Sequence, residues 1–164
     1  MSSKNVLAVF AHPDDDELSC FGFLLRMIRS GYRVNVLELS KGEQSVYAKG
    51  NNRFFESKKS SENVGINLIS ADFPDGSIRY EIQTIKTIEE YFDCYDPFLV
   101  LTHYPQNFGK GHQDHAVISS CVTNVARRRR IPFVIYTEPV PQNEDFVPNL
   151  FIDISDVFEQ KIKA

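Results

Sequence analysis

The stretch VLAVFAHPDDDE, residues 6–17, joins a continuous apolar run to a turn crowded with one imidazole and four acids. Residues 6–10 are apolar without interruption, which is typical of a strand buried on both faces of a sheet. From Leu18 to Ile28 the apolar residues repeat at helical spacing, and Gly31 then ends the pattern. The stretch therefore predicts a buried strand followed directly by a helix, with the polar residues at the turn between them.

Strand-like and helix-like segments alternate along the rest of the chain. The further strands that we expect are residues 34–39, 67–70, 98–102, 133–137 and 150–154, and the further helices are residues 53–64, 82–92, 117–125 and 157–162. This alternation predicts βαβ units, and hence an α/β fold that is Rossmann-like, with three α/β/α layers and a mostly parallel sheet. At 164 residues we expect a single domain, residues 1–164.

Charge and cysteine content narrow the class of protein. The net charge of −4 argues against a nucleic-acid partner, and the one basic block, Arg127 to Arg130, fits the C-terminal end of a helix. The cysteines Cys20, Cys94 and Cys121 are odd in number and far apart, which indicates reduced thiols. The apolar run behind the N-terminus is too short for a membrane span or a signal-peptide core. We therefore expect a cytoplasmic protein.

A second polar cluster, GHQDH at residues 111–115, follows another apolar run at residues 98–102. His103 ends that run, and the two clusters together hold the three other histidines of the chain. In a doubly wound sheet the first strand lies centrally with the fourth strand beside it, and ligands bind at the carboxyl ends of the strands where the strand order reverses. Both clusters follow carboxyl ends, so we expect them to meet.

The spacing within each cluster fits a metal ion. His12 and Asp15 are three residues apart at a strand-to-helix turn, and His112 and His115 have the same spacing at the start of a helix. Two imidazoles and one carboxylate with an open position form a common catalytic zinc arrangement. In the alternative interpretation the acids cap a helix and the second cluster is an exposed turn, but this does not account for His12. We interpret the pair of clusters as a metal site.

Other features of the sequence bear on the chemistry. No Gly-rich phosphate loop follows the first strand and no Gly-x-Ser-x-Gly elbow is present, which excludes the usual nucleotide-binding and serine-hydrolase sites. The irregular stretch at residues 40–52 is long, polar and next to a strand end, so it is either an active-site loop or a plain solvent loop.

Both clusters resemble the motifs of the PIG-L-type, or LmbE-like, zinc N-deacetylases. The sequence HPDDDEL at residues 12–18 is similar to the first motif of that family, A-H-P-D-D-x-E, and HQDH at residues 112–115 is similar to its second, H-x-D-H. The resemblance runs from Val6 to the end of the chain, with weaker similarity at residues 136–139 and 151–154. Members of the family are usually longer at the C-terminus.

The resemblance implies a role for each residue that matches the family pattern. The implied ligands of one zinc ion, or of another divalent metal, are His12, Asp15 and His115. Asp14 would be the general base, and His112 would be the acid or electrophilic partner, with its ring held and its pKa kept high by Asp114. Arg53 and Asp75 would contact the sugar. The implied reaction removes the acetyl group from an N-acetylated sugar of the N-acetylglucosamine type, either a small molecule or a glycoconjugate.

Two other functions remain open at this point. One is a phosphoesterase-like metal hydrolase, which would need a second metal and further acidic ligands such as Asp16 and Glu17. The other is a non-catalytic carbohydrate-binding domain with a structural metal, although structural sites tend to be closed. The sequence also leaves the oligomeric state open, with a homo-oligomer among the alternatives.

Overall fold

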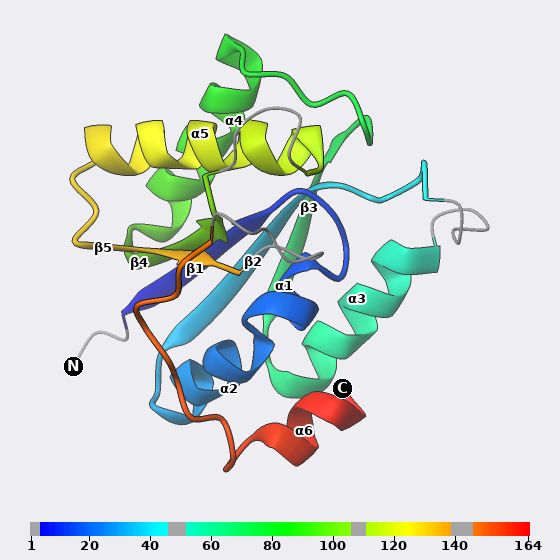
Figure 1. Cartoon of the computed structure of the whole chain (residues 1–164), viewed down its shortest axis with the longest axis vertical. Helices are drawn as coiled ribbons and strands as arrows, with labels where there is room; N and C mark the ends of the chain where they lie inside the picture. Colours follow the sequence, from blue (N-terminus) through cyan, green and yellow to red (C-terminus); the bar gives the residue numbers. More distant parts are fainter. Residues whose placement is uncertain (1–3, 46–51, 106–110, 139–145) are drawn as a thin grey trace.

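A computed structural model describes residues 4–45, 52–105, 111–138 and 146–164, and it shows a five-stranded sheet in the order β3-β2-β1-β4-β5 (Figure 1). The strands are β1 (Asn5–Phe10), β2 (Arg33–Ser40), β3 (Asn67–Phe73), β4 (Pro97–His103) and β5 (Phe133–Thr137). Every pairing between neighbouring strands is parallel. The predicted parallel α/β sheet, with the first strand between the second and the fourth, is confirmed.

The apolar run at residues 6–10 forms the central strand β1. It has a strand on each side and a hydrophobic core on each face of the sheet. Val6 pairs with Val34 of β2 and with Leu99 of β4, and residues 6–10 are all fully buried. Side chains on alternate residues of a strand point to opposite faces of the sheet. Accordingly, Leu7 belongs to the hydrophobic core on one face, whereas Val6 belongs to the core on the other.

Helices cover both faces of the sheet, which gives the expected three layers (Figure 1). One face carries α4 (Ile82–Tyr95) and α5 (Gln113–Arg128), and the other carries α1 (Asp15–Ser19), α2 (Phe21–Arg29), α3 (Asn52–Val64) and α6 (Phe158–Lys163). The single helix expected after β1 is two helices, because Cys20 leaves the helical region with a φ of −142° and separates α1 from α2.

The prediction of a sixth strand at residues 150–154 is wrong. Phe151 is exposed, and the segment lies against α2 instead of pairing with β5. Arg26 donates to the backbone carbonyl of Asp153, and Arg29 donates to that of Asp156 at 2.6 Å. Within residues 150–154, the carbonyl of Asp153 is thus satisfied by an arginine, and Ile154 packs against Gly22 of α2, so this segment is held on the helix layer and not at the sheet edge.

The structure also bears on the expectations about the basic block, the cysteines and membrane spans. Arg127 and Arg128 lie in the last turn of α5, and the three cysteines are free thiols. Among the helices of the described residues, none is long and apolar enough to cross a membrane. Residues 46–51 of the candidate loop, residues 108–110 before the second cluster and Pro139 lie outside the described residues.

Candidate metal centre

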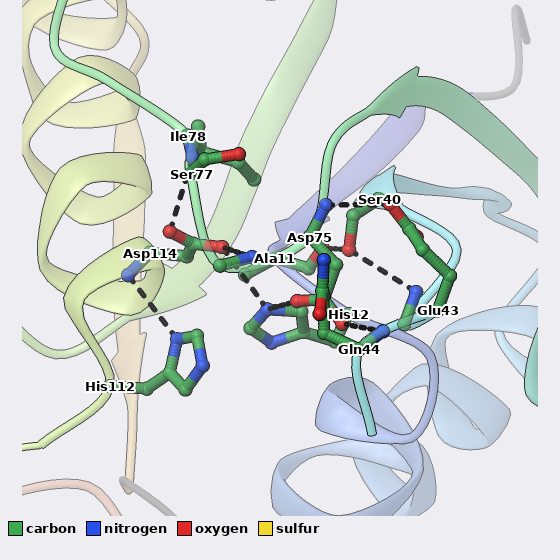
Figure 2. A network of polar contacts seen from close by, with 12 residues as sticks. Ala11, His12, Ser40, Glu43, Gln44, Asp75, Ser77, Ile78, His112 and Asp114 are labelled. Carbon is green, nitrogen blue, oxygen red and sulfur yellow. Dashed lines mark hydrogen bonds and ion pairs between the residues drawn. The ribbon is translucent and has the colours of Figure 1, made fainter. Parts of the chain in front are cut away.

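The two polar clusters meet at the carboxyl edge of the sheet. His12 follows β1, Asp15 begins α1, and His115 lies in the first turn of α5, beside the end of β4. The turn after β3 adds Asp75 to the same place, next to His12 (Figure 2). The switch point of the strand order therefore brings together residues that are about a hundred positions apart in sequence, as predicted.

The three expected ligands face one another at short distances. His12 Nδ1 lies 3.2 Å from His115 Nε2 and 3.5 Å from Asp15 Oδ2, and His115 Nε2 lies 3.3 Å from Asp15 Oδ1. Tetrahedral ligands that are about 2.0–2.1 Å from a zinc ion lie roughly 3.3–3.4 Å from each other. The spacings between these side chains are close to this value, with the two imidazoles facing different oxygens of the Asp15 carboxylate.

Asp15 is held in place as a carboxylate. The backbone N–H of His12 donates to Asp15 Oδ2 at 2.8 Å, which fixes the carboxylate at the base of the turn. Burial opposes ionisation, but the surrounding imidazoles of His103, His115 and His12 hold the pKa of Asp15 well below its usual range. An ionised carboxylate is the form that binds a metal ion.

The other ring nitrogen of His12 faces two further acids. Nε2 lies 3.0 Å from Asp75 Oδ1 and 3.4 Å from Asp114 Oδ2. Burial works against a charged imidazole, yet Asp114 and Asp15 together raise the pKa of His12 to about 10. The centre therefore favours a positive charge, which a proton on His12 or a metal ion can supply.

Asp14 lies next to the expected ligands, and its carboxylate pairs with Arg53. It is the N-cap residue of α1 in the left-handed conformation, with a φ of 85°, and within the described residues its side chain makes no capping hydrogen bond. Its Oδ2 instead pairs with Arg53 at 2.7 Å, and Arg53 also donates to the carbonyl of Pro13 at 2.6 Å. Burial raises the pKa of Asp14, and Arg53 partly offsets that rise. Asp14 is thus a half-exposed carboxylate with the backbone of a strained turn.

The geometry around Asp114 differs from the expected one. Its carboxylate accepts from the backbone N–H groups of Gly76 at 2.8 Å and Ile78 at 3.2 Å, and these two bonds turn it toward His12 (Figure 2). Contact with His112 comes from the Asp114 backbone N–H, which donates to His112 Nδ1 at 3.3 Å. The expected rise in the pKa of His112 is absent: burial, and then the nearby charges of His12 and His115, lower it.

Asp75 and Arg53, the two expected sugar contacts, both bind protein groups in this structure. Asp75 is buried, and its Oδ2 accepts from the backbone N–H of Gln44 at 2.9 Å (Figure 2). Its own N–H donates to Glu43 at 2.8 Å, so it ties the loop after β2 to the turn after β3. Both side chains nevertheless lie at the centre, Asp75 against His12 and Arg53 against Asp14.

His103 was given no role from the sequence, although its position at the end of a strand was a signal. Its Nε2 accepts from the backbone N–H of Ala11 at 3.0 Å, and its ring stacks on that of His115 at 3.9 Å between centroids. Burial lowers its pKa to about 3, so the ring is neutral at physiological pH. His103 therefore positions His115 and the turn that carries the first cluster.

Comparisons with known proteins agree with this geometry. Residues 7–126 match the family described as PIG-L, GlcNAc-PI de-N-acetylase. A diacetylchitobiose deacetylase from Thermococcus kodakarensis is 29% identical to this chain in an alignment of 180 positions. The alignment covers 98% of this chain and 67% of that protein.

Solved structures share the fold at lower identity. The N,N'-diacetylchitobiose deacetylase from Pyrococcus horikoshii superposes with a TM-score of 0.83 at 18% identity, over 99% of this chain and 68% of that one. A 4-carboxy-2-hydroxymuconate hydratase from Pseudomonas putida gives the same TM-score at 22% identity, over 98% of this chain and 76% of that one. The match to the family itself covers most of the sequence, including both clusters. The chain therefore belongs to the PIG-L family of GlcNAc-PI de-N-acetylases.

Proposed function

We propose that this protein is a zinc-dependent hydrolase that removes the acetyl group from an N-acetylated sugar. The observation that carries the proposal is the close approach of His12, Asp15 and His115. The two ring nitrogens lie 3.2 Å apart, and each lies within 3.5 Å of one carboxylate oxygen of Asp15. Beside them is a further carboxylate, Asp14, which pairs with Arg53. Family membership supports the same reaction, as does the similarity to a protein named as a diacetylchitobiose deacetylase.

The residues around the centre can supply the separate functions that amide hydrolysis requires. Bound zinc would polarise the amide carbonyl and lower the pKa of a water molecule to about 7. Asp14 is the residue that accepts the proton of the attacking water, because its carboxylate is half exposed and its raised pKa suits a general base. Arg53 holds this carboxylate at 2.7 Å and so fixes the direction from which it acts.

His112 is proposed as the electrophilic partner, which donates a hydrogen bond to the oxygen of the substrate carbonyl as negative charge develops on it. It is exposed at the rim of the centre, with its ring 4.5 Å from that of His12, so it can reach a bound substrate. Because its Nδ1 accepts from the Asp114 backbone, the hydrogen of the neutral ring sits on Nε2, which is free to donate that hydrogen bond. The proton that Asp14 takes from the attacking water is then passed to the departing amine. In this role Asp114 acts through its backbone on His112 and through its carboxylate on His12.

The two alternative functions have less support. The acids that a phosphoesterase would add, Asp16 and Glu17, gather with Glu38 and form a separate group from the one at His12. A closed structural site does not explain Asp14 or the exposed rim residue His112. We propose Arg53 and Asp75 as sugar contacts, a small molecule or glycoconjugate as the substrate, and the cytoplasm as the compartment, where free cysteines are usual.

An assay for acetate tests the proposal. The zinc-loaded protein is incubated with N-acetylglucosamine and with diacetylchitobiose, and acetate and free amine are both measured. We expect equal amounts of the two products, and loss of both in the His115→Ala variant. Absence of both products from every N-acetylated sugar tested, in a folded protein that holds one zinc ion per chain, would refute the proposal.

A further inference from the structure

Three acids form a second group on the inner side of α1, which we call the acidic cluster: Asp16, Glu17 and Glu38. Asp16 and Glu17 lie in the first turn of α1, and Glu38 lies in β2. Each contributes a carboxylate oxygen to a set whose members are within 4.8 Å of one another. Asp16 and Glu38 are fully buried, so water does not separate these charges from the protein.

The acidic cluster has few hydrogen-bond donors. The hydroxyl of Ser57 in α3 lies 2.8 Å from Glu17 Oε1 and 2.7 Å from Glu38 Oε1, but a hydroxyl has only one hydrogen to donate. Both oxygens of Asp16, Oε2 of Glu17 and Oε2 of Glu38 are buried and have no hydrogen-bond partner among the described residues. Within the same part of the chain, no ion pair reaches any of the three acids.

Unpaired carboxylates in a protein interior are strongly unfavourable unless a positive charge compensates them. The compensating charge is either protons shared among the acids or a bound cation. The available ligands are all hard oxygens: at least one carboxylate oxygen from each of the three acids, and the hydroxyl of Ser57. Ca²⁺ binds 6–8 such oxygens at about 2.3–2.6 Å, so that ligands on opposite sides of the ion lie roughly 4.6–5.2 Å apart. Oxygens of the three acids that all lie within 4.8 Å of one another can therefore belong to one such sphere.

We propose that the acidic cluster is a second cation site, distinct from the centre at His12, and that it takes Ca²⁺. The unpartnered carboxylate of Asp16 points into the site, and Ser57 closes it from α3. The ion would link β2, α1 and α3. It would thereby stabilise α1, the short helix that begins at Asp15. The role is structural, and the proposal holds whatever reaction the centre at His12 performs.

The test measures Ca²⁺ binding directly. The protein is loaded with zinc, so that the centre at His12 is filled, then desalted and titrated with CaCl₂ in a calorimeter. We expect one Ca²⁺ per chain, and a melting temperature that rises by roughly 5–10 °C at a hundredfold excess over Kd. Glu38→Gln removes one of three charges and should weaken Ca²⁺ binding at least tenfold, because affinity follows the charge of the ligands.

A matched variant controls for a general effect of losing a carboxylate. Glu62 lies exposed on α3, the helix of Ser57, and Glu62→Gln should bind Ca²⁺ like the wild type. In chelator, Glu38→Gln should melt at or above the wild type, because it relieves repulsion, and Ca²⁺ should reverse that order. If the wild type shows neither heat of binding nor a shift in melting temperature with Ca²⁺, shared protons compensate the acids and the proposal is wrong. The calorimetric result on the wild type decides this even if Glu38→Gln fails to fold.

Discussion

Replacing Asp14 by Asn separates the general base from the metal ligands. The amide keeps the size of the side chain but cannot accept the proton of the attacking water. Asn is also the right choice for the backbone, because Asp14 has a φ of 85° and Asn tolerates this left-handed conformation, whereas Ala would add strain. The variant should therefore remain folded and keep its zinc.

The expected loss of rate is large compared with the loss of stability. General-base catalysis is typically worth ~100- to 10,000-fold in rate, which corresponds to roughly 3–5 kcal/mol in the activation barrier. The ion pair between Asp14 and Arg53 is half exposed on the Asp14 side, so its removal costs at most about 1 kcal/mol of unfolding free energy. Asp15→Asn differs, because a neutral amide is a poorer ligand and zinc should be lost as well.

Zinc content, acetate release and urea unfolding are measured side by side for both variants. Asp72→Asn is a matched control, since Asp72 also has a positive φ of 60° and an ion pair of 2.7 Å, in this case with Lys41. It should behave like the wild type in all three measurements. A zinc-loaded Asp14→Asn enzyme that releases acetate nearly as fast as the wild type would refute the assignment of the base.

Three further predictions concern the stability of variants at Gly42, His103 and Ile118. Gly42→Ala should destabilise the protein by about 1–2 kcal/mol in urea unfolding and raise KM, because φ is +68° and a Cβ would lie 3.1 Å from Arg53. Burial lowers the pKa of His103 to about 3, so its contribution to stability is present above pH 6.5 and is lost as the pH falls toward 3. The test measures the free energy of unfolding of metal-depleted protein between pH 6.5 and 5. The wild type should lose up to ~1.4 kcal/mol more per pH unit than His103→Gln. Equal dependence on pH in the two proteins would contradict this. Ile118→Ala should cost about 2–5 kcal/mol in urea unfolding, because Ile118 lies on α5 and is fully buried in the core between that helix and the sheet; a smaller loss would mean that the core repacks.

The central part of the fold was predictable because a single physical requirement set it. The uninterrupted apolar run at residues 6–10 needs cover on both faces, and only a central strand provides this. The meeting of the two polar clusters followed, because the carboxyl ends of adjacent parallel strands share one edge of the sheet. The segment at residues 150–154 misled the prediction because its partners, Arg26 and Gly22, belong to α2, which no periodicity in the segment itself reveals.

The details of the site depended on contacts that a sequence pattern does not contain. The direction of the Asp114 carboxylate is set by the backbone N–H groups of Gly76 and Ile78, and therefore by the path of a turn. The role of His103 depends on its ring stacking under that of His115. Glu38 gave a signal that was overlooked, because it is a single acid within the apolar run of β2.

Zinc reconstitution tests the central claim most directly. Metal-depleted protein receives zinc in steps up to two equivalents, and bound zinc and acetate release are measured at each step. Our account predicts that activity rises in proportion to bound zinc and reaches its plateau at one equivalent, while His115→Ala neither retains the ion nor gains activity. Acetate release that is undiminished in protein without bound metal, or a full equivalent of zinc retained by His115→Ala, would contradict it.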